Sequence, residues 1–146
     1  MDFMTALDIG ASALSTERTH MNIISMNLAN AKTTRTPEGG PYRRKTVVLQ
    51  STEVDHPFSK QMQSAMDRDL RGVRVMEVTQ DKRPLKKVFE PGHPDADEEG
   101  YVFYPDINVV EEMASLMTVQ RGYEANISSM EAVKTMYNKA LDLGKG

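Results

Sequence analysis

Residues 107–141 read INVVEEMASLMTVQRGYEANISSMEAVKTMYNKAL, and this stretch decides the fold. Its larger apolar and aromatic residues recur at alternating spacings of three and four, which is the period of one face of an α-helix. Eight of the ten positions on this stripe are apolar or aromatic, and Gln120 and Lys134 are the exceptions. The helix would extend for about 50 Å, so the pattern predicts a coiled coil or an assembly subunit rather than a simple globule. Its predicted seam residues are Val109, Met113, Leu116, Tyr123, Ile127, Met130, Tyr137 and Leu141.

The first 31 residues predict a second long helix with a matching seam. This segment contains no proline, and a cluster of threonine, glycine and proline at 33–41 should end the helix. Because each helix presents one apolar stripe, we expect the two to pack together as an antiparallel coiled coil. Residues 1–34 and 107–146 would then form one helical core domain. The predicted seam residues of the first helix are Leu7, Leu14, Met21 and Leu28.

Residues 35–106 predict a small β-rich segment between the two helices. The runs that predict strands are short, rich in β-branched or aromatic residues, and bounded by turn-forming residues. Residues 51–71 are polar and have no clear period, so we expect a long loop there, with at most one helical turn around 61–70. The predicted fold class is therefore α+β. The candidate strands are 45–50, 72–80, 84–92 and 100–105.

The composition excludes several classes of protein. The 18 basic and 21 acidic residues give a net charge of -3, without the basic excess of a dedicated nucleic-acid-binding protein. The chain has no cysteine, which excludes a disulfide scaffold, a thiolate zinc site and a cysteine nucleophile. No apolar run approaches the roughly 20 residues that cross a bilayer, so no membrane span is expected. The first eight residues carry two acids and no base, and a classical secretory signal is not expected either.

No segment carries a strong catalytic or metal-binding motif. The residues His20, His56 and His93 lie in three separate segments, and none has a second histidine at ligand spacing. The segment from Asp95 to Gly100 partly resembles a calcium loop, but the prolines around it oppose the flanking helices that such a loop requires. An acidic hairpin loop is the simpler interpretation. We therefore expect no enzymatic activity, no cofactor and no metal.

Charge is distributed unevenly along the chain. Residues 32–45 contain five bases and one acid, whereas residues 95–112 contain seven acids and no base. A run of like charge usually forms a solvated face, but complementary blocks can also orient neighbouring subunits. Arg43, Arg44 and Lys45 are the candidates for such contacts between subunits.

Three signatures follow one another along the chain in a specific order. They occupy the end of the first helix, the region between the last two candidate strands, and the first half of the last helix. In this order they resemble the bacterial flagellar rod and hook axial proteins, and within them the FlgC family of proximal rod proteins. The residues that carry the resemblance are Leu28, Ala29, Asn30, Ala31, Pro91, Gly92, Tyr101, Arg121, Tyr123, Ala125 and Asn126.

The resemblance implies a structural, non-enzymatic subunit of the flagellar basal-body rod, the drive shaft and export conduit between the membrane ring and the distal rod. It implies further copies of the same subunit and the rod proteins FliE, FlgB, FlgF and FlgG as partners. It also implies passage through the flagellar type III export apparatus without a cleaved signal peptide, and a final location in the periplasmic rod. The helical seams alone would equally fit an unrelated cytosolic coiled-coil adaptor. A secreted enzyme with an unrecognised site in residues 51–105 is a further alternative.

Overall fold

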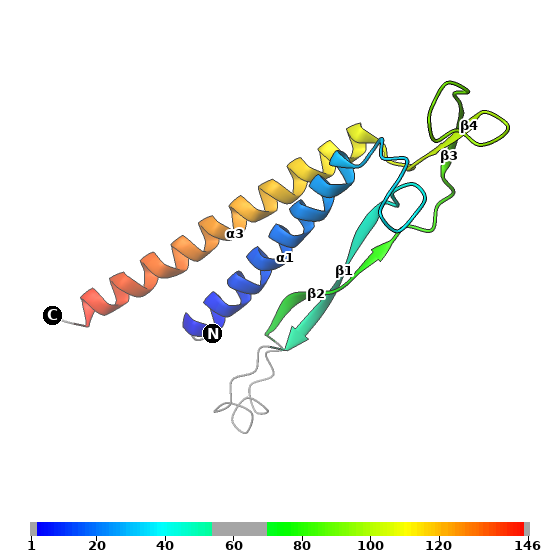
Figure 1. Cartoon of the computed structure of the whole chain (residues 1–146). Coiled ribbons are helices and arrows are strands. Elements are labelled where there is room, and N and C mark those ends of the chain that lie inside the picture. The colour runs from blue at the N-terminus through cyan, green and yellow to red at the C-terminus, as the bar shows by residue number, and fades with distance from the viewer. Residues whose placement is uncertain (1–2, 54–69, 145–146) are drawn as a thin grey trace. The chain divides into compact units, whose positions relative to one another are not determined.

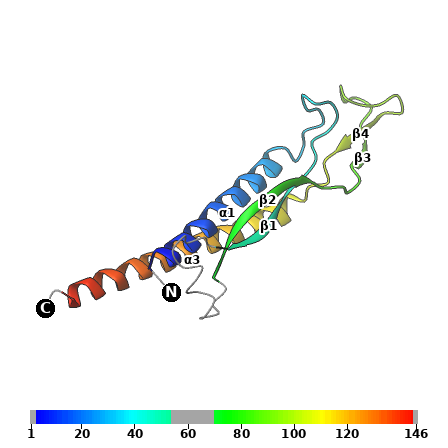
Figure 2. The ribbon, with the colours of Figure 1, turned by 90° about the horizontal axis from the view of Figure 1, so that it is seen from below.

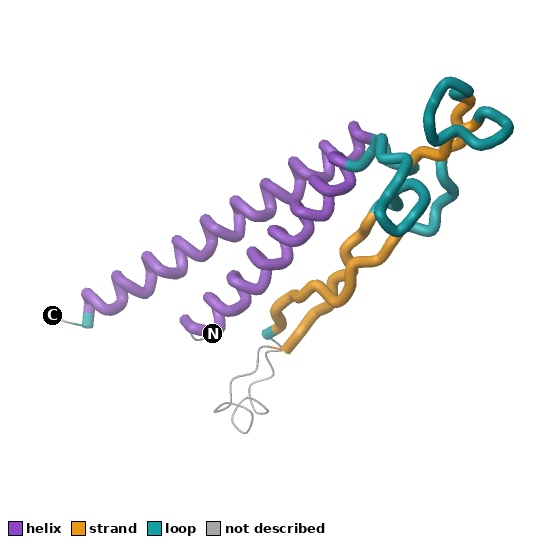
Figure 3. The backbone as a smooth tube through the Cα atoms, viewed as in Figure 1, coloured by secondary structure: helices purple, strands orange, loops and turns teal. Residues whose placement is uncertain are grey.

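The computed structural model describes residues 3–53 and 70–144, and these form two long helices separated by short strands (Figures 1 and 3). This arrangement confirms the predicted α+β class. The expected helical turn around 61–70 and most of the expected loop at 51–71 lie outside the described residues. None of the helices in the described part of the chain is long and apolar enough to cross a membrane. The elements are α1 (Phe3–Ala29), β1 (Lys45–Glu53), β2 (Arg71–Gln80), β3 (Lys86–Phe89), β4 (Tyr101–Tyr104) and α3 (Val109–Leu143).

Side-chain capping fixes where α1 ends and where α3 begins. At the end of α1, both the backbone N–H and the side-chain amide of Asn30 donate to the carbonyl of Met26, at 3.1 and 2.9 Å. Asn108 caps α3, because its Oδ1 accepts the N–H of Val110 at 3.1 Å and its Nδ2 donates to Glu111 at 3.0 Å. Such contacts satisfy backbone groups that the first and last turns of a helix leave unpaired.

The chain divides into two compact units, and each long helix contributes to both. Unit 1 consists of residues 1–19, 49–76 and 120–146, and unit 2 consists of residues 20–48 and 77–119. Each unit thus draws residues from all three segments that were distinguished in the sequence.

In unit 1, the two helices meet in an antiparallel register (Figures 1 and 2). The rings of Phe3 and Tyr137 stack with their centroids 4.0 Å apart. Seven residues further along α1 and seven residues back along α3, a Cβ at Gly10 would lie only 2.7 Å from Cγ of Met130. The spacing of seven is typical of a coiled coil. The close approach at Gly10 requires a residue without a side chain.

Unit 2 contains the apolar side chains that are buried in the described residues. Ile23 and Ile24 of α1, Val119 of α3 and Val102 of β4 lie in this core together with Tyr42. Strands β3 and β4 form an antiparallel two-stranded sheet, separate from the two-stranded sheet of β1 and β2.

Candidate functional site: a buried polar junction and exposed apolar faces

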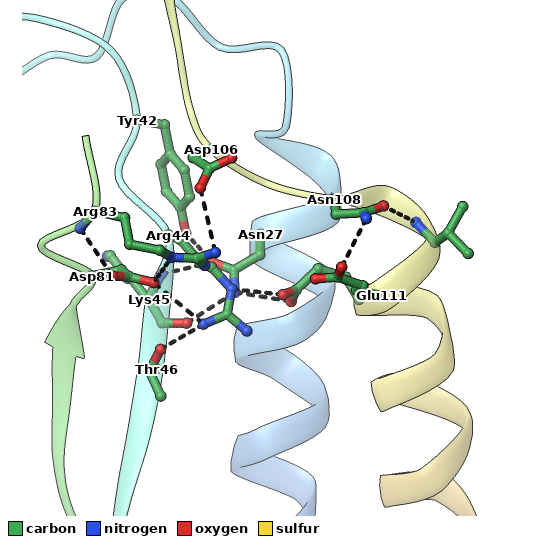
Figure 4. Close-up of polar contacts among 12 residues, drawn as sticks. Asn27, Tyr42, Arg44, Lys45, Thr46, Asp81, Arg83, Asp106, Asn108 and Glu111 are labelled. Carbon is green, nitrogen blue, oxygen red and sulfur yellow. Dashed lines mark hydrogen bonds and ion pairs between the residues drawn. The ribbon is translucent and has the colours of Figure 1, made fainter. Parts of the chain in front are cut away.

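A network of polar groups, centred on the buried side chains of Asn27, Tyr42 and Glu112, joins α1, β1 and α3 within unit 2 (Figure 4). We call it the polar junction and define it by Asn27, Tyr42, Arg44, Lys45 and Glu112. Only 1% of Asn27 is exposed, and its side-chain amide makes four hydrogen bonds. A primary amide offers two donors and two acceptor positions, so this side chain is fully satisfied.

The side-chain amide of Asn27 bonds to both backbone polar groups of Lys45, the first residue of β1, as a neighbouring strand would. Its Oδ1 accepts the N–H of Lys45 at 2.9 Å, and its Nδ2 donates to the carbonyl of Lys45 at 2.9 Å. The hydroxyl of Tyr42 donates to the same Oδ1 at 3.0 Å. This pairing fixes the start of β1 against the last two turns of α1.

The carboxylate of Glu112 connects α3 to the same point. Glu112 is 2% exposed, and its Oε1 accepts from Nε of Arg44 at 2.7 Å, while its Oε2 accepts from Nδ2 of Asn27 at 3.2 Å. Arg44 also donates to Oγ1 of Thr46 at 2.9 Å. A buried ion pair contributes more to a defined geometry than to net stability, because desolvation offsets much of the attraction. Removing one partner is costly, since the other charge is left buried.

Two further ion pairs extend the junction toward the linker before α3. Asp81 donates its N–H to the carbonyl of Arg44 at 2.7 Å, and its carboxylate accepts from Nε of Arg83 at 2.7 Å. Arg83 in turn lies 3.3 Å from Asp106. The hydrogen bonds from Arg83 lower the pKa of Asp81, because they favour the charged carboxylate.

The pKa of Tyr42 is shifted for a different reason. Burial raises the pKa of its hydroxyl, and the negative charge of Glu112 raises it further. The phenol therefore stays protonated and continues to donate to Asn27 across the neutral pH range.

The predicted seam residues divide into two groups in the single chain. Those of α1 (Leu7, Leu14, Met21 and Leu28) are half-buried. In α3, Leu116, Tyr123, Ile127 and Met130 are half-buried, whereas Val109, Met113, Tyr137 and Leu141 are exposed. The most buried face of α1 instead carries Thr5, Thr16, Ile23, Ile24 and Asn27.

The polar residues on this face of α1 hydrogen-bond to a strand in unit 1. The hydroxyl of Ser12 accepts the N–H of Val73 in β2 at 3.2 Å, and the hydroxyl of Thr16 lies 3.4 Å from the carbonyl of the same residue. A Cβ at Gly72 would lie 2.9 Å from Oγ of Ser12. The helix and the strand are therefore in close contact through small and polar side chains.

Four residues of the family signatures lie where the chain changes direction, and the others lie in α1, β4 and α3. Asn30 caps α1, and its Oδ1 accepts from the hydroxyl of Thr33 at 3.1 Å. Pro91 and Gly92 lie in the β3–β4 loop, where a Cβ at Gly100, whose φ is +82°, would approach Pro91 to 3.2 Å. The other signature residues are half-buried (Leu28, Ala31, Tyr101, Tyr123 and Asn126) or exposed (Ala29, Arg121 and Ala125).

The three candidates for charge contacts between subunits have different surroundings. Arg44 is bound within the chain to Glu112, a member of the acidic block at 95–112. Arg43 is exposed, and it lines an open pocket together with Lys45. The side chains of Arg43 and Lys45 are therefore accessible for contacts with another molecule.

In the acidic loop between β3 and β4, several carboxylate oxygens already bond to other groups of the same chain. Oδ1 of Asp97 accepts the N–H groups of Glu99 and Tyr101 at 3.0 and 2.8 Å. Asp95 accepts from the hydroxyl of Thr34 at 2.8 Å, and Glu99 pairs with Lys87 at 3.4 Å. Within 3–53 and 70–144, no group of three potential ligands is arranged to hold a metal ion.

Sequence reasoning did not single out Asn27, Tyr42 or the junction role of Glu112. Acidic residues at the start of a helix interact favourably with the helix dipole, which is the ordinary reason for a pair such as Glu111-Glu112. The structure shows that Glu112 is buried and paired, so the helix dipole is not the whole reason for it. One signal was present: Asn27 lies one helical turn after two apolar residues, Ile23 and Ile24, and a polar residue on an apolar stripe points to a buried polar contact.

Comparisons with known proteins cover both ends and the whole length of the chain. The family model described as "Flagella basal body rod protein" matches residues 7–35, and the one described as "Flagellar basal body rod FlgEFG protein C-terminal" matches residues 98–143. Three relatives, each named flagellar basal-body rod protein FlgC, come from Borreliella burgdorferi, Bacillus subtilis and Salmonella typhimurium.

The similarity to these relatives extends from end to end. The Borreliella burgdorferi protein is 36% identical, and the match covers all of both chains. The Bacillus subtilis protein is 42% identical over 96% of this chain and 97% of its own length, and the Salmonella typhimurium protein is 40% identical over 99% and 100%. This membership replaces the alternative of an unrelated coiled-coil adaptor. With identity at this level along the full length, the chain belongs to the FlgC family of flagellar basal-body rod proteins.

Proposed function

We propose that this subunit of the flagellar basal-body rod is a structural, non-enzymatic building block that polymerises with further copies of itself and with FliE, FlgB, FlgF and FlgG. The polymer acts as a drive shaft and as an export conduit between the membrane ring and the distal rod. In this proposal the subunit passes through the flagellar type III export apparatus and reaches the periplasmic part of the rod. The observation that carries the proposal is the full-length similarity to rod proteins.

The exposed apolar side chains support a role in assembly. An isolated soluble chain rarely exposes large contiguous apolar patches, and such patches commonly mark contacts with other proteins. At the start of α3, in unit 2, the exposed apolar residues are Val109, Val110, Met113 and Met117. At the end of α3, in unit 1, they are Met136, Tyr137, Leu141 and Leu143.

We assign the predicted seam residues of α3 to two kinds of contact. The half-buried ones, such as Leu116 and Ile127, pack within the subunit and become fully buried in the rod. The exposed ones, such as Val109 and Leu141, contact neighbouring subunits, and Tyr137 does so in addition to its stacking on Phe3. Methionine suits this second role, because its flexible thioether adapts to neighbours that are not identical.

The accessible charges are assigned in the same way. Arg43 and Lys45 meet acidic groups of a neighbouring subunit, whereas Arg44 contributes to the subunit's own polar junction. A single exposed pair contributes only about 0–1 kcal/mol. These contacts therefore select the neighbour and its orientation rather than hold the rod together.

A deletion strain complemented with variants tests the proposal. We expect the deletion to abolish swimming, and we expect the complementing protein to co-purify with isolated basal bodies. A variant that lacks His20, His56 and His93 should restore swimming fully, because a structural subunit needs no catalytic histidine. Failure of the wild-type protein to enter basal bodies would refute the rod assignment, and failure of the histidine-free variant in a normally assembled rod would refute the non-enzymatic role.

A further inference from the structure

The β3–β4 hairpin of unit 2 presents an aromatic face. In the antiparallel register, Phe89 lies opposite Tyr101 and Lys87 lies opposite Phe103. Directly opposite residues share one face of a sheet, and residues two apart on a strand do so as well. These four residues therefore lie on one side of the hairpin, and we call this side the aromatic face. The other side includes Lys86 and the fully buried Val102.

The aromatic face is preorganised by its own contacts. The rings of Phe89 and Tyr101 meet edge to face with their centroids 5.2 Å apart. The ammonium group of Lys87 lies 4.0 Å from the centroid of the Tyr101 ring and 5.8 Å from that of Phe103. Even so, Phe89 remains 61% exposed and Phe103 remains 40% exposed. Two of the four phenylalanines in the chain therefore lie at the surface of a two-stranded hairpin.

We propose that this aromatic face docks onto the start of helix α3 of a second copy of the chain. This inference rests on the proposed rod function, and it names a contact through which two copies recognise each other. Rings that are fixed by their neighbours lose little conformational entropy on binding, so they serve well as anchors at interfaces.

The start of α3 has the complementary chemistry. Val110, Met113 and Met117 follow the three-four spacing of one helical face, and they are 75%, 55% and 58% exposed. Thioether sulfurs pack favourably against aromatic rings, and their flexibility lets them follow the contour of the hairpin. The exposed Glu111 lies beside Val110, and it carries the charge opposite to that of Lys87, whose ammonium group also pairs with the exposed Glu99 at 3.4 Å. Apolar and charged groups therefore complement each other across the proposed contact.

The size of the two surfaces indicates when the contact forms. The exposed parts of Phe89 and Phe103 together amount to about one whole side chain, roughly 150–250 Å². The three helical residues expose about two further side chains, so the contact falls well below the roughly 1,200 Å² of a stable interface. Two free subunits should therefore not dimerise through it alone. In the rod, other contacts hold the copies close together, and the high effective concentration lets this small contact form.

Site-specific photocrosslinking in living cells tests the inference. A benzophenone-bearing phenylalanine replaces Phe103 on the aromatic face, and the matched control carries the same probe at Lys86 on the opposite side of the hairpin. Basal bodies are isolated after irradiation, and their denatured proteins are separated by mass. We expect the probe at Phe103 to give a product of twice the subunit mass, in which it is joined to a peptide spanning Val110 to Met117. The Lys86 probe should not give this product.

The outcomes separate the docking contact from the rod function. If basal bodies contain neither the wild-type chain nor the probe-bearing chain, the rod function itself is contradicted. Basal bodies that contain the chain but give no such product, or give a product with a different rod protein, would overturn the docking contact alone.

A pair of substitutions provides the second measurement. Phe89→Ser combined with Phe103→Ser should lower the amount of this subunit that isolated basal bodies contain, whereas Lys86→Ser should not. The urea midpoint of each purified variant monitors folding, because both rings also contact residues of the hairpin itself. Normal incorporation of the double variant would overturn the proposal.

Discussion

Replacement of Asn27 by alanine should destabilise the protein more than its position on a helix suggests. The substitution removes the partner of the N–H and carbonyl of Lys45, of the Tyr42 hydroxyl and of the Glu112 carboxylate, which keeps its bond from Arg44. A buried polar group without a partner costs about 1–3 kcal/mol. Lys45 is only half-buried and regains water in part, so we expect a total loss of about 3–4 kcal/mol. Natural domains are stable by only about 5–15 kcal/mol, so this loss is large.

Urea denaturation of the purified variants measures this effect. The matched control is Asn22→Ala, because Asn22 is an exposed residue of the same helix. Both substitutions gain the same helix propensity, so the difference between them isolates the polar junction. Amide exchange of Lys45 gives a second readout, since its N–H loses its acceptor only in the Asn27 variant. A difference below about 0.5 kcal/mol, the usual range of surface substitutions, would refute the reasoning.

Three further predictions concern the helix contact, the seam and the ion pairs. Gly10→Ala should destabilise the protein by about 1 kcal/mol, because the added methyl group overpacks against Met130. In a Met130→Ala background the same substitution should stabilise the protein by up to about 1 kcal/mol, because alanine has the higher helix propensity. The urea midpoints of the wild type, both single variants and the double variant check this reversal of sign. Leu116→Asp should cost several kcal/mol, about 2–4, once the helix is buried in the rod, so swimming should be lost; normal swimming would contradict the seam. Arg83→Ala should raise the pKa of Asp81 in an NMR pH titration. The pKa of Asp81 is lowered in the folded chain, so its charged carboxylate stabilises the fold at a pH above the ordinary Asp pKa of ~3.9. This stabilisation is lost as the pH falls through the lowered pKa. The variant lacks the pair with Arg83 and should therefore lose less stability on acidification.

The regular elements could be predicted because their signals are local. The observed helices, Phe3–Ala29 and Val109–Leu143, begin and end within two residues of the predicted bounds. The three-four spacing of apolar residues is a property of neighbouring residues, and so is the β-branched content of Lys45–Glu53. Both signals survive in one sequence without any knowledge of the tertiary structure.

The polar junction could not be predicted because its contacts are distant in sequence. Asn27 bonds to Tyr42, Lys45 and Glu112, which lie 15, 18 and 85 residues away. An asparagine or a glutamate in a helix reads as a surface residue, since burial of such groups is favourable only when every partner is in place. The tertiary structure supplies these partners, so no local sequence pattern predicts them.

The buried face of α1 could not be predicted from hydropathy. Hydropathy ranks Leu7 and Leu14 above Thr5 and Thr16, yet both threonines are buried and both leucines are half-buried. A threonine can be buried on a helix because its hydroxyl bonds to the carbonyl four residues before it, as that of Thr16 does to Ser12 at 2.9 Å. Its small volume also allows a close approach to a strand. Hydropathy measures neither property.

The distribution of buried groups connects the junction to assembly. Among the described residues, five apolar side chains are buried in addition to Pro105, and sixteen large ones are exposed. So small an apolar core cannot fix the geometry of the chain through packing. The buried amide of Asn27 and the Arg44–Glu112 pair can do so, because hydrogen bonds are directional and an unpaired partner is costly. Polar contacts therefore contribute strongly to the geometry of unit 2, while many methionine, valine and phenylalanine side chains remain exposed. In an ordinary globular domain most large apolar side chains are buried, and their exposure here agrees with the proposed role of the chain as a polymerising subunit.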